Sequence, residues 1–339
     1  MKLRVLAIDG GGIKGIVPTT ILQYLENKIK ELTCNYKIKI SDYFDFIGGT
    51  STGSIVGAGM LVPNEKGTPK YYMGDIIDLY YKFGSDIFTA NTQTKIKSLW
   101  GLIGPKYPSK NIENTFLETF DHYKISELLK PCLFTAYDIT ERRANIYTNF
   151  DENKKYKDMF IKDIVRGSTC VPSFFPPAYF TDNTYIHTIV DGGVYAANPS
   201  MVTYVEISKT WFGGQQSKLY TPKDVTFVSL GTGLINDKSY TYKKTKKWGK
   251  AQWMIPAIDI MMSSQCETVN YEIGKLFDGW GASDNYHRLE PNLVFGNYSF
   301  IDASEKNLDN LVQDTKNYIM EHHDELDTLA KKLCYEEEV

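Results

Sequence analysis

The chain has 339 residues, of which 42% are hydrophobic, and 38 lysines and arginines against 41 aspartates and glutamates give it a net charge of −3. This composition supports a large folded core and excludes disorder as the main state. The lack of excess positive charge argues against a partner such as nucleic acid that is bound through a global positive field.

The cysteines and the N-terminus bear on the compartment. The five cysteines are odd in number and far apart, without the C-x-x-C spacing of zinc sites or the density of a disulfide framework. The N-terminus begins a strand almost at once, which leaves no room for a signal peptide, and no segment approaches 18 uncharged apolar residues. We therefore expect a cytoplasmic protein without a metal, a cofactor or a membrane-spanning helix.

The first element is a strand over residues 3–8, followed by the loop "DGGGIKG" and a helix with apolar residues at helical spacing from Val17 to Leu32. The three glycines Gly10, Gly11 and Gly12 allow several backbone N–H groups to approach an anion. The loop is therefore an oxyanion hole, a phosphate-binding loop or an ordinary tight turn. Lys14 adds charge near such a site or is a solvated surface cation, and the sequence favours the second interpretation.

The second unit repeats this pattern in "FDFIGGTSTGSIVGAG", residues 44–59, where a short apolar strand ends at glycines and a helix begins near residue 54. Residues 49–53 match G-x-S-x-G, the nucleophile elbow, in which a serine occupies a sharp turn between a strand and a helix. Gly49 and Gly53 would allow the close packing that the turn requires. Ser51 is therefore the candidate nucleophile, and the helix that follows would direct its N-terminal amides toward the same place.

The remaining elements alternate in the same way. Helices are predicted within residues 75–83, 111–120 and 158–171, a strand pair at 132–140 and 144–150, and strands ending in glycine-rich turns at 187–193 and 224–233. The rest is mainly helical, including a capped helix from Ser304. This order predicts an α/β fold with a mainly parallel sheet covered on both faces. We expect a single domain over residues 1–339, with residues 301–339 as a helical C-terminal extension.

A nucleophilic serine needs a base. None of the five histidines occupies a glycine-flanked strand end, so no Ser-His-Asp triad is visible. Asp191 is the better candidate, because "HTIVDGGVYAANP" places it directly after an apolar strand. If the carboxyl ends of parallel strands converge at one edge of the sheet, Asp191 could meet Ser51 there. Taken alone, "DGG" is equally typical of an aspartate in a turn.

With "DGGGIKG", "GTSTG" and "DGG" in this order, the chain resembles the patatin-like phospholipases, which are lipid acyl hydrolases with a serine-aspartate dyad. Further segments similar to the plant storage patatins include "YFDFIGGTSTG", "VPSFFPPAYF", "VSLGTG" and "DASEKNLDNL", and they span nearly the whole chain. One departure is "STCVPS", residues 168–173, where relatives tend to have small alanines, so the size of the acyl pocket could differ.

The resemblance implies a three-layer α/β/α sandwich and a serine esterase of the phospholipase A type that uses no metal. It implies that Ser51 attacks an ester carbonyl, that Asp191 accepts the proton without a histidine, and that the amides of Gly10, Gly11 and Gly12 hold the oxyanion. The implied substrates are phospholipids, lysophospholipids or galactolipids. The resemblance leaves the lipid head group and the oligomeric state open.

Two stretches could bring the enzyme into contact with lipid, although neither is counted as a membrane anchor. The first is "KKTKKWGKAQWMIPAIDIMM", which combines five lysines with Trp248, Trp253 and Met254, a composition that could lie at an anionic membrane surface. Such a stretch more commonly forms a solvated turn followed by a buried helix. "IKSLWGLIGPKY" places Trp100 and Leu102 on a loop that could border an acyl channel.

Two other functions remain as alternatives. A kinase of the actin-like fold can carry a loop similar to "AIDGGGIKG", but that fold requires a second strand directly after the loop, where this chain has a helical pattern, and it leaves "GTSTG" unexplained. A lipid-binding protein of the same fold without catalytic activity is the other alternative, and an intact Ser51 and Asp191 argue against it.

Overall fold

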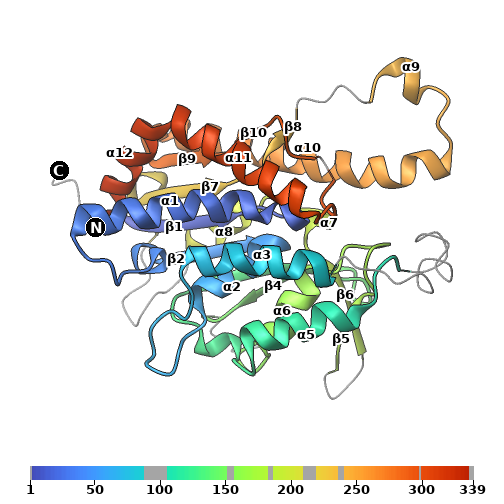
Figure 1. The fold of residues 1–339 in the computed structure, drawn as a ribbon, viewed down its shortest axis with the longest axis horizontal. Coiled ribbons are helices and arrows are strands. Elements are labelled where there is room, and N and C mark those ends of the chain that lie inside the picture. Colours follow the sequence, from blue (N-terminus) through green and yellow to red (C-terminus); the bar gives the residue numbers. More distant parts are fainter. Residues whose placement is uncertain are drawn as a thin grey trace.

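An eight-stranded sheet forms the centre of the protein, in the order β5-β6-β3-β2-β1-β7-β9, with β4 paired to β3 (Figure 1). The computed structural model describes residues 2–87, 105–150, 156–181, 186–208, 219–235, 240–297 and 299–335. The parallel strands are β1 (Leu3–Ile8), β2 (Phe46–Thr50), β3 (Cys132–Asp138), β7 (Val225–Leu230) and β9 (Tyr286–Leu289). The antiparallel strands are β4 (Arg143–Thr148), β5 (Ala178–Thr181) and β6 (Ile186–Asp191).

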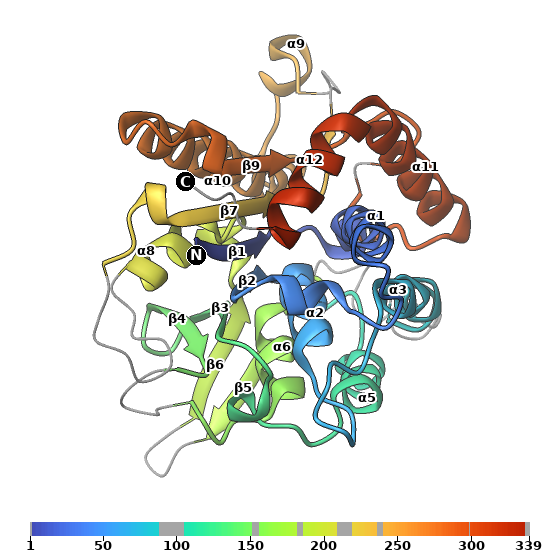
Figure 2. The same cartoon turned by 90° about the vertical axis from the view of Figure 1, so that its left-hand side faces the viewer.

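Helices cover both faces of the sheet, as the view along its edge shows (Figure 2). One face carries α1 (Ile16–Thr33), α2 (Thr52–Leu61), α3 (Met73–Ile87), α5 (Ser109–Phe120), α6 (Ile161–Ser168), α11 (Glu305–Glu321) and α12 (His323–Cys334). The other face carries α8 (Ser200–Ser208) and α10 (Lys250–Gly279). The predicted α/β sandwich with a mainly parallel sheet is therefore confirmed.

Alternation along the central strands produces the two cores. In β1, Leu6 and Ile8 pack into the larger core, whereas Val5 and Ala7 pack into the smaller core on the opposite face. Successive side chains of a strand point to opposite faces, so a strand covered on both faces is apolar throughout. This is why the sequence of β1 lacks an alternation of apolar and polar residues.

The C-terminal helices pack against α1 and share the larger core. The Ser304 hydroxyl accepts a hydrogen bond from the Asn307 amide at 3.4 Å, which confirms the predicted N-cap of α11. The division of the chain into one domain with a C-terminal extension remains a prediction.

Two boundaries and one strand differ from the sequence-based expectation. Strand β2 continues through Gly48 and Gly49 to Thr50, and α2 begins at Thr52, two residues before the expected start. Strand β9 was not expected from the sequence. Residues 286–289 form a four-residue strand that pairs with β7 alone in the described sheet. Such a short, half-buried edge strand carries little periodic signal.

Helix α1 connects β1 to β2, and these two strands are parallel neighbours. The actin-like alternative requires a strand directly after the glycine loop, whereas the chain continues into α1. This arrangement excludes the actin-like fold.

Candidate active site

Ser51 occupies the sharp turn between β2 and α2, in a backbone conformation with φ 55° and ψ −121°. A positive φ is uncommon for a residue with a Cβ atom and is a form of strain typical of functional sites. The two flanking glycines make the turn possible. A Cβ atom on Gly49 would lie 2.4 Å from the carbonyl oxygen of Gly53, and one on Gly53 would lie 2.1 Å from that of Ile8.

Asp191 reaches Ser51 by a different route from the one expected. Strand β6 is antiparallel to β3, so the two candidate residues do not meet through convergence of parallel strands. Instead, Thr50 pairs with Thr135 while Asp191 pairs with Ala136. The carboxyl ends of β2 and β6 therefore arrive at adjacent positions along β3 from opposite directions.

The Ser51 hydroxyl donates a hydrogen bond to Asp191 Oδ2 at 2.6 Å, and the Gly193 amide donates to Asp191 Oδ1 at 2.7 Å. Both side chains of the pair are buried. Burial raises the pKa of Asp191 to about 7, although the bonds from Ser51 and Gly193 oppose that rise. The carboxylate can therefore accept a proton near neutral pH.

No histidine takes part in the hydrogen bonds that the described residues make with Ser51 or Asp191. His187 precedes Asp191 by four residues on β6, about 13 Å along a strand, and its Nδ1 lies 2.7 Å from the buried carboxylate of Asp138. That the serine works without a histidine partner remains a prediction.

The glycine loop lies beside the elbow, but its three amides differ. The Gly10 amide donates to the carbonyl oxygen of Ala197 at 2.8 Å and is therefore occupied. The Gly11 and Gly12 amides have no partner within the described chain, and Gly12 lines the same pocket as Ser51. Gly12 has φ 60°, and a Cβ atom there would lie 2.1 Å from the carbonyl oxygen of Phe300. Only glycine fits this position.

A buried ion pair supports the start of the loop. The Arg288 guanidinium lies 2.7 Å from both Asp9 Oδ2 and Glu290 Oε2. Burial raises the pKa of Asp9 to about 6 although Arg288 opposes the rise. Lys14 is not the solvated surface cation that the sequence favours, because it is partly buried and burial lowers its pKa.

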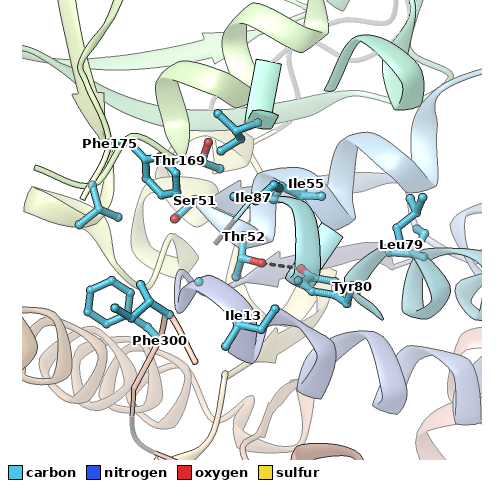
Figure 3. Close-up of a pocket in the computed structure, with 16 residues that line it drawn as sticks. Ile13, Ser51, Thr52, Ile55, Leu79, Tyr80, Ile87, Thr169, Phe175 and Phe300 are labelled. Carbon is cyan, nitrogen blue, oxygen red and sulfur yellow. Dashed lines mark hydrogen bonds between the residues drawn. The ribbon is translucent and has the colours of Figure 1, made fainter. Parts of the chain in front are cut away.

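Ser51 opens into a pocket with mostly apolar walls, formed by the glycine loop, α2, α3 and the segment that follows α6 (Figure 3). The hydroxyls of Thr52 and Tyr80 bond to each other, which leaves little free polar surface in this part of the wall. The pocket is therefore suited to an apolar chain. Its lining consists of Gly12, Ile13, Ser51, Thr52, Ile55, Ile76, Leu79, Tyr80, Gly84, Ile87, Ile112, Thr169, Val171, Phe175, Phe300 and Ile301.

The sequence analysis did not identify Ser168 as a site residue. The Ser168 hydroxyl accepts a hydrogen bond from the Ser51 backbone amide at 2.9 Å and so holds the strained turn in place. The only sequence signal near it was the unusual segment 168–173, which was interpreted only in terms of the size of the acyl pocket. Thr169 and Val171 of that segment do line the pocket. Trp100 and Leu102, which the sequence suggested for the border of an acyl channel, lie outside the described residues.

The described ranges contain no candidate metal site and no candidate membrane-spanning helix. No group of three or more histidine, cysteine, aspartate or glutamate side chains there could hold a metal ion. None of the helices in the same part of the chain combines the length and hydropathy needed to cross a bilayer.

Comparison with known proteins gives a consistent result. The family model described as patatin-like phospholipase matches residues 6–204. Patatin group D-2 of Solanum tuberosum is 33% identical over 94% of this chain and 84% of its own length. A protein called probable inactive patatin-3-Kuras 1, from the same plant, is also 33% identical, over 94% of this chain and 86% of its own. A relative whose name calls it probably inactive is therefore as similar in sequence to this chain as patatin group D-2 is.

Proposed function

The chain belongs to the patatin-like phospholipase family, and we propose that it is an active lipid acyl hydrolase in which Ser51 and Asp191 form the catalytic dyad. The observation that carries this proposal is the 2.6 Å hydrogen bond between the two side chains, of which Ser51 lines an apolar pocket. A non-catalytic lipid-binding protein would have no need of a strained serine beside a buried carboxylate.

In the proposed reaction, Asp191 accepts the hydroxyl proton as Ser51 Oγ attacks the ester carbonyl carbon. The resulting oxyanion accepts hydrogen bonds from the Gly11 and Gly12 amides, which are the free donors of the loop. When the tetrahedral intermediate collapses, the bond to the alcohol breaks, and the alcohol leaves with the proton from Asp191. The fatty acyl group then remains on Ser51 as an ester.

Deacylation repeats these steps with water. Asp191 accepts a proton from the water as the water oxygen attacks the acyl carbon, and the fatty acid leaves when the Ser51 oxygen recovers that proton. One residue can act first as base and then as acid because burial places the pKa of Asp191 at about 7. The protein would act as a serine esterase of the phospholipase A type.

Covalent labelling tests this proposal. A fluorophosphonate probe should label the protein with a stoichiometry of one, and Ser51→Ala should abolish both labelling and ester cleavage. Ser54→Ala is the matched control, because Ser54 lies three residues away and its hydroxyl bonds only to the Ser51 carbonyl oxygen in the described contacts. Unchanged cleavage by Ser51→Ala would contradict the assignment.

A substrate panel then defines the specificity. Purified protein assayed with phospholipids, lysophospholipids and galactolipids would identify the head group and the acyl position. Absence of cleavage for every ester, together with lipid binding, would instead support the non-catalytic alternative.

A further inference from the structure

Residues 240–254, which we call the arm, extend from the body of the protein. The arm contains the short helix α9 (Tyr242–Thr245) and the first turn of α10. Figure 1 shows α9 and the start of α10 beyond the end of the sheet, at the same end of the molecule as α7 (Gly193–Ala196). Figure 2 shows α9 outside both helical layers. The arm is therefore not needed to cover the sheet.

The aromatic rings of the arm pack on one another, and the Tyr240 hydroxyl also donates a hydrogen bond to Asp259 of α10 at 3.1 Å. Trp248 lies against Trp253 with ring centroids 5.2 Å apart, and against Tyr240 at 5.9 Å. Tyr242 is 81% exposed, Trp253 39% and Met254 38%. None of the described arm residues belongs to either hydrophobic core. This apolar surface therefore faces solvent.

The arm also concentrates positive charge. Its five lysines are all exposed, and residues 240–258 contain no acidic residue. Within the described chain none of these lysines forms an ion pair with a carboxylate. The whole protein carries a net charge of −3, so this cationic patch contrasts with the rest of the surface. The lysines are Lys243, Lys244, Lys246, Lys247 and Lys250.

The arm is joined directly to the candidate active site through α10. The side chain of Gln265 on α10 accepts the Ala197 amide at 3.1 Å, in the segment that follows Asp191. Trp253 lies twelve residues earlier on the same helix, about 18 Å along its axis. A surface bound by the arm would therefore lie close to the end of the molecule where Ser51 and Asp191 meet.

Exposed lysines together with tryptophan and tyrosine match the interface of an anionic bilayer. The ammonium groups would meet lipid phosphates and carboxylates, and the rings would enter the boundary between head groups and acyl chains. The geometry points to the arm as the element that docks this protein on an anionic lipid surface. Docking itself is independent of the proposed hydrolysis, whereas its benefit to catalysis rests on that function.

Vesicle flotation tests docking in a Ser51→Ala background, so that the lipids stay intact. The protein should float with vesicles of phosphatidylcholine and phosphatidylserine but not with phosphatidylcholine alone, and salt should release it. Lys243→Glu with Lys244→Glu should weaken partitioning at least about tenfold, and Trp253→Ala should weaken it by a similar factor. The matched control is Lys316→Glu with Lys331→Glu, which reverses the charge of two exposed lysines on α11 and α12. This control should retain binding.

Several outcomes would overturn the proposal. These are binding that is equal for both vesicle types, arm variants that float like the parent protein, and a parent protein that does not bind. A change in the elution volume of arm variants without lipid would show that the arm holds a second copy instead. In the active protein, arm variants should lose cleavage of vesicle lipids but keep cleavage of a soluble short-chain ester. If the active protein cleaves neither the vesicle lipid nor the soluble ester but still floats with anionic vesicles, the proposed hydrolase function is wrong and the proposed docking by the arm is supported.

Discussion

Asp191 Oδ2 accepts a hydrogen bond from the Ser51 hydroxyl at 2.6 Å, and Asp191 Oδ1 accepts one from the Gly193 amide. No cation in the described chain pairs with this carboxylate. The Gly193 bond fixes the carboxylate plane, which is the orienting role that a third residue has in a triad. Because the carboxylate is buried without a counter-charge, its proton affinity is raised, and the first two predictions depend on this.

The rate of ester cleavage should depend on the ionised form of Asp191. Since burial raises the pKa of Asp191 to about 7, kcat/KM should fall about tenfold for each pH unit below that value and level off above it. A pH profile with a soluble ester measures this limb. Asp138→Asn is the matched control, because Asp138 is also buried but bonds to His187. This variant should show the same decrease of kcat/KM below about pH 7 as the parent protein. A limb near pH 4 would argue against Asp191 as the base.

The same pKa shift should destabilise the folded protein at high pH. The folded pKa of Asp191 is about 7 against an ordinary value of 3.8, so the ionised carboxylate costs stability that is fully felt above pH 7 and vanishes below pH 4. Asp191→Asn removes this titration. Its stability relative to the parent should rise between pH 4 and pH 7 by at most about 4 kcal/mol, measured by urea denaturation at several pH values. A difference independent of pH would contradict the shift.

The elbow should not tolerate a side chain at Gly49. A Cβ atom there would meet the backbone of Gly53 at 2.4 Å, so Gly49→Ala should destabilise the protein by roughly 3 kcal/mol or more and remove activity. Gly274→Ala on α10 is the control, because nothing lies within 4 Å of its Cβ position. That change should be neutral or stabilise by about 0.5–1 kcal/mol. Thermal unfolding of both variants measures the contrast.

Removal of Arg288 should leave the buried carboxylate of Asp9 and the partly buried carboxylate of Glu290 without their cation. Arg288→Met should cost roughly 3 kcal/mol of stability, and adding Asp9→Asn should recover part of that loss, so the two effects should not add. Lys275→Met breaks an exposed pair with Asp278 and should change stability by less than about 1 kcal/mol. Additive losses from Arg288→Met and Asp9→Asn would show that the pair is not coupled.

The pocket should set the acyl chain length. Val171 lines the pocket beside Ser51, so Val171→Phe should reduce kcat/KM for long-chain esters and spare short ones. Each methylene excluded from the pocket should cost about 0.8 kcal/mol of binding, roughly fourfold. Cleavage of a series of esters of increasing chain length measures the shift. An unchanged preference would place the acyl chain elsewhere.

Local sequence patterns predicted much of the fold and both members of the candidate dyad. "GTSTG" identified Ser51 because the elbow needs its glycines within two residues, and "DGG" identified Asp191. Patterns could not predict the direction of β6, because pairing between distant strands depends on tertiary register. For the same reason the sequence did not reveal that the Gly10 amide donates a hydrogen bond to the Ala197 carbonyl. It also did not reveal that the Ser168 hydroxyl accepts one from the Ser51 amide.

The Gly10–Ala197 hydrogen bond described above and a second hydrogen bond next to it tie distant segments of the site together. The Gly10 amide donates to Ala197, and the Thr50 hydroxyl donates at 2.7 Å to the adjacent carbonyl of Ala196. The loop after β1, the end of β2 and the segment after Asp191 are therefore clamped to one another. The Gly10 amide should exchange its hydrogen with solvent only when this clamp opens, so its protection factor reports on the integrity of all three segments at once.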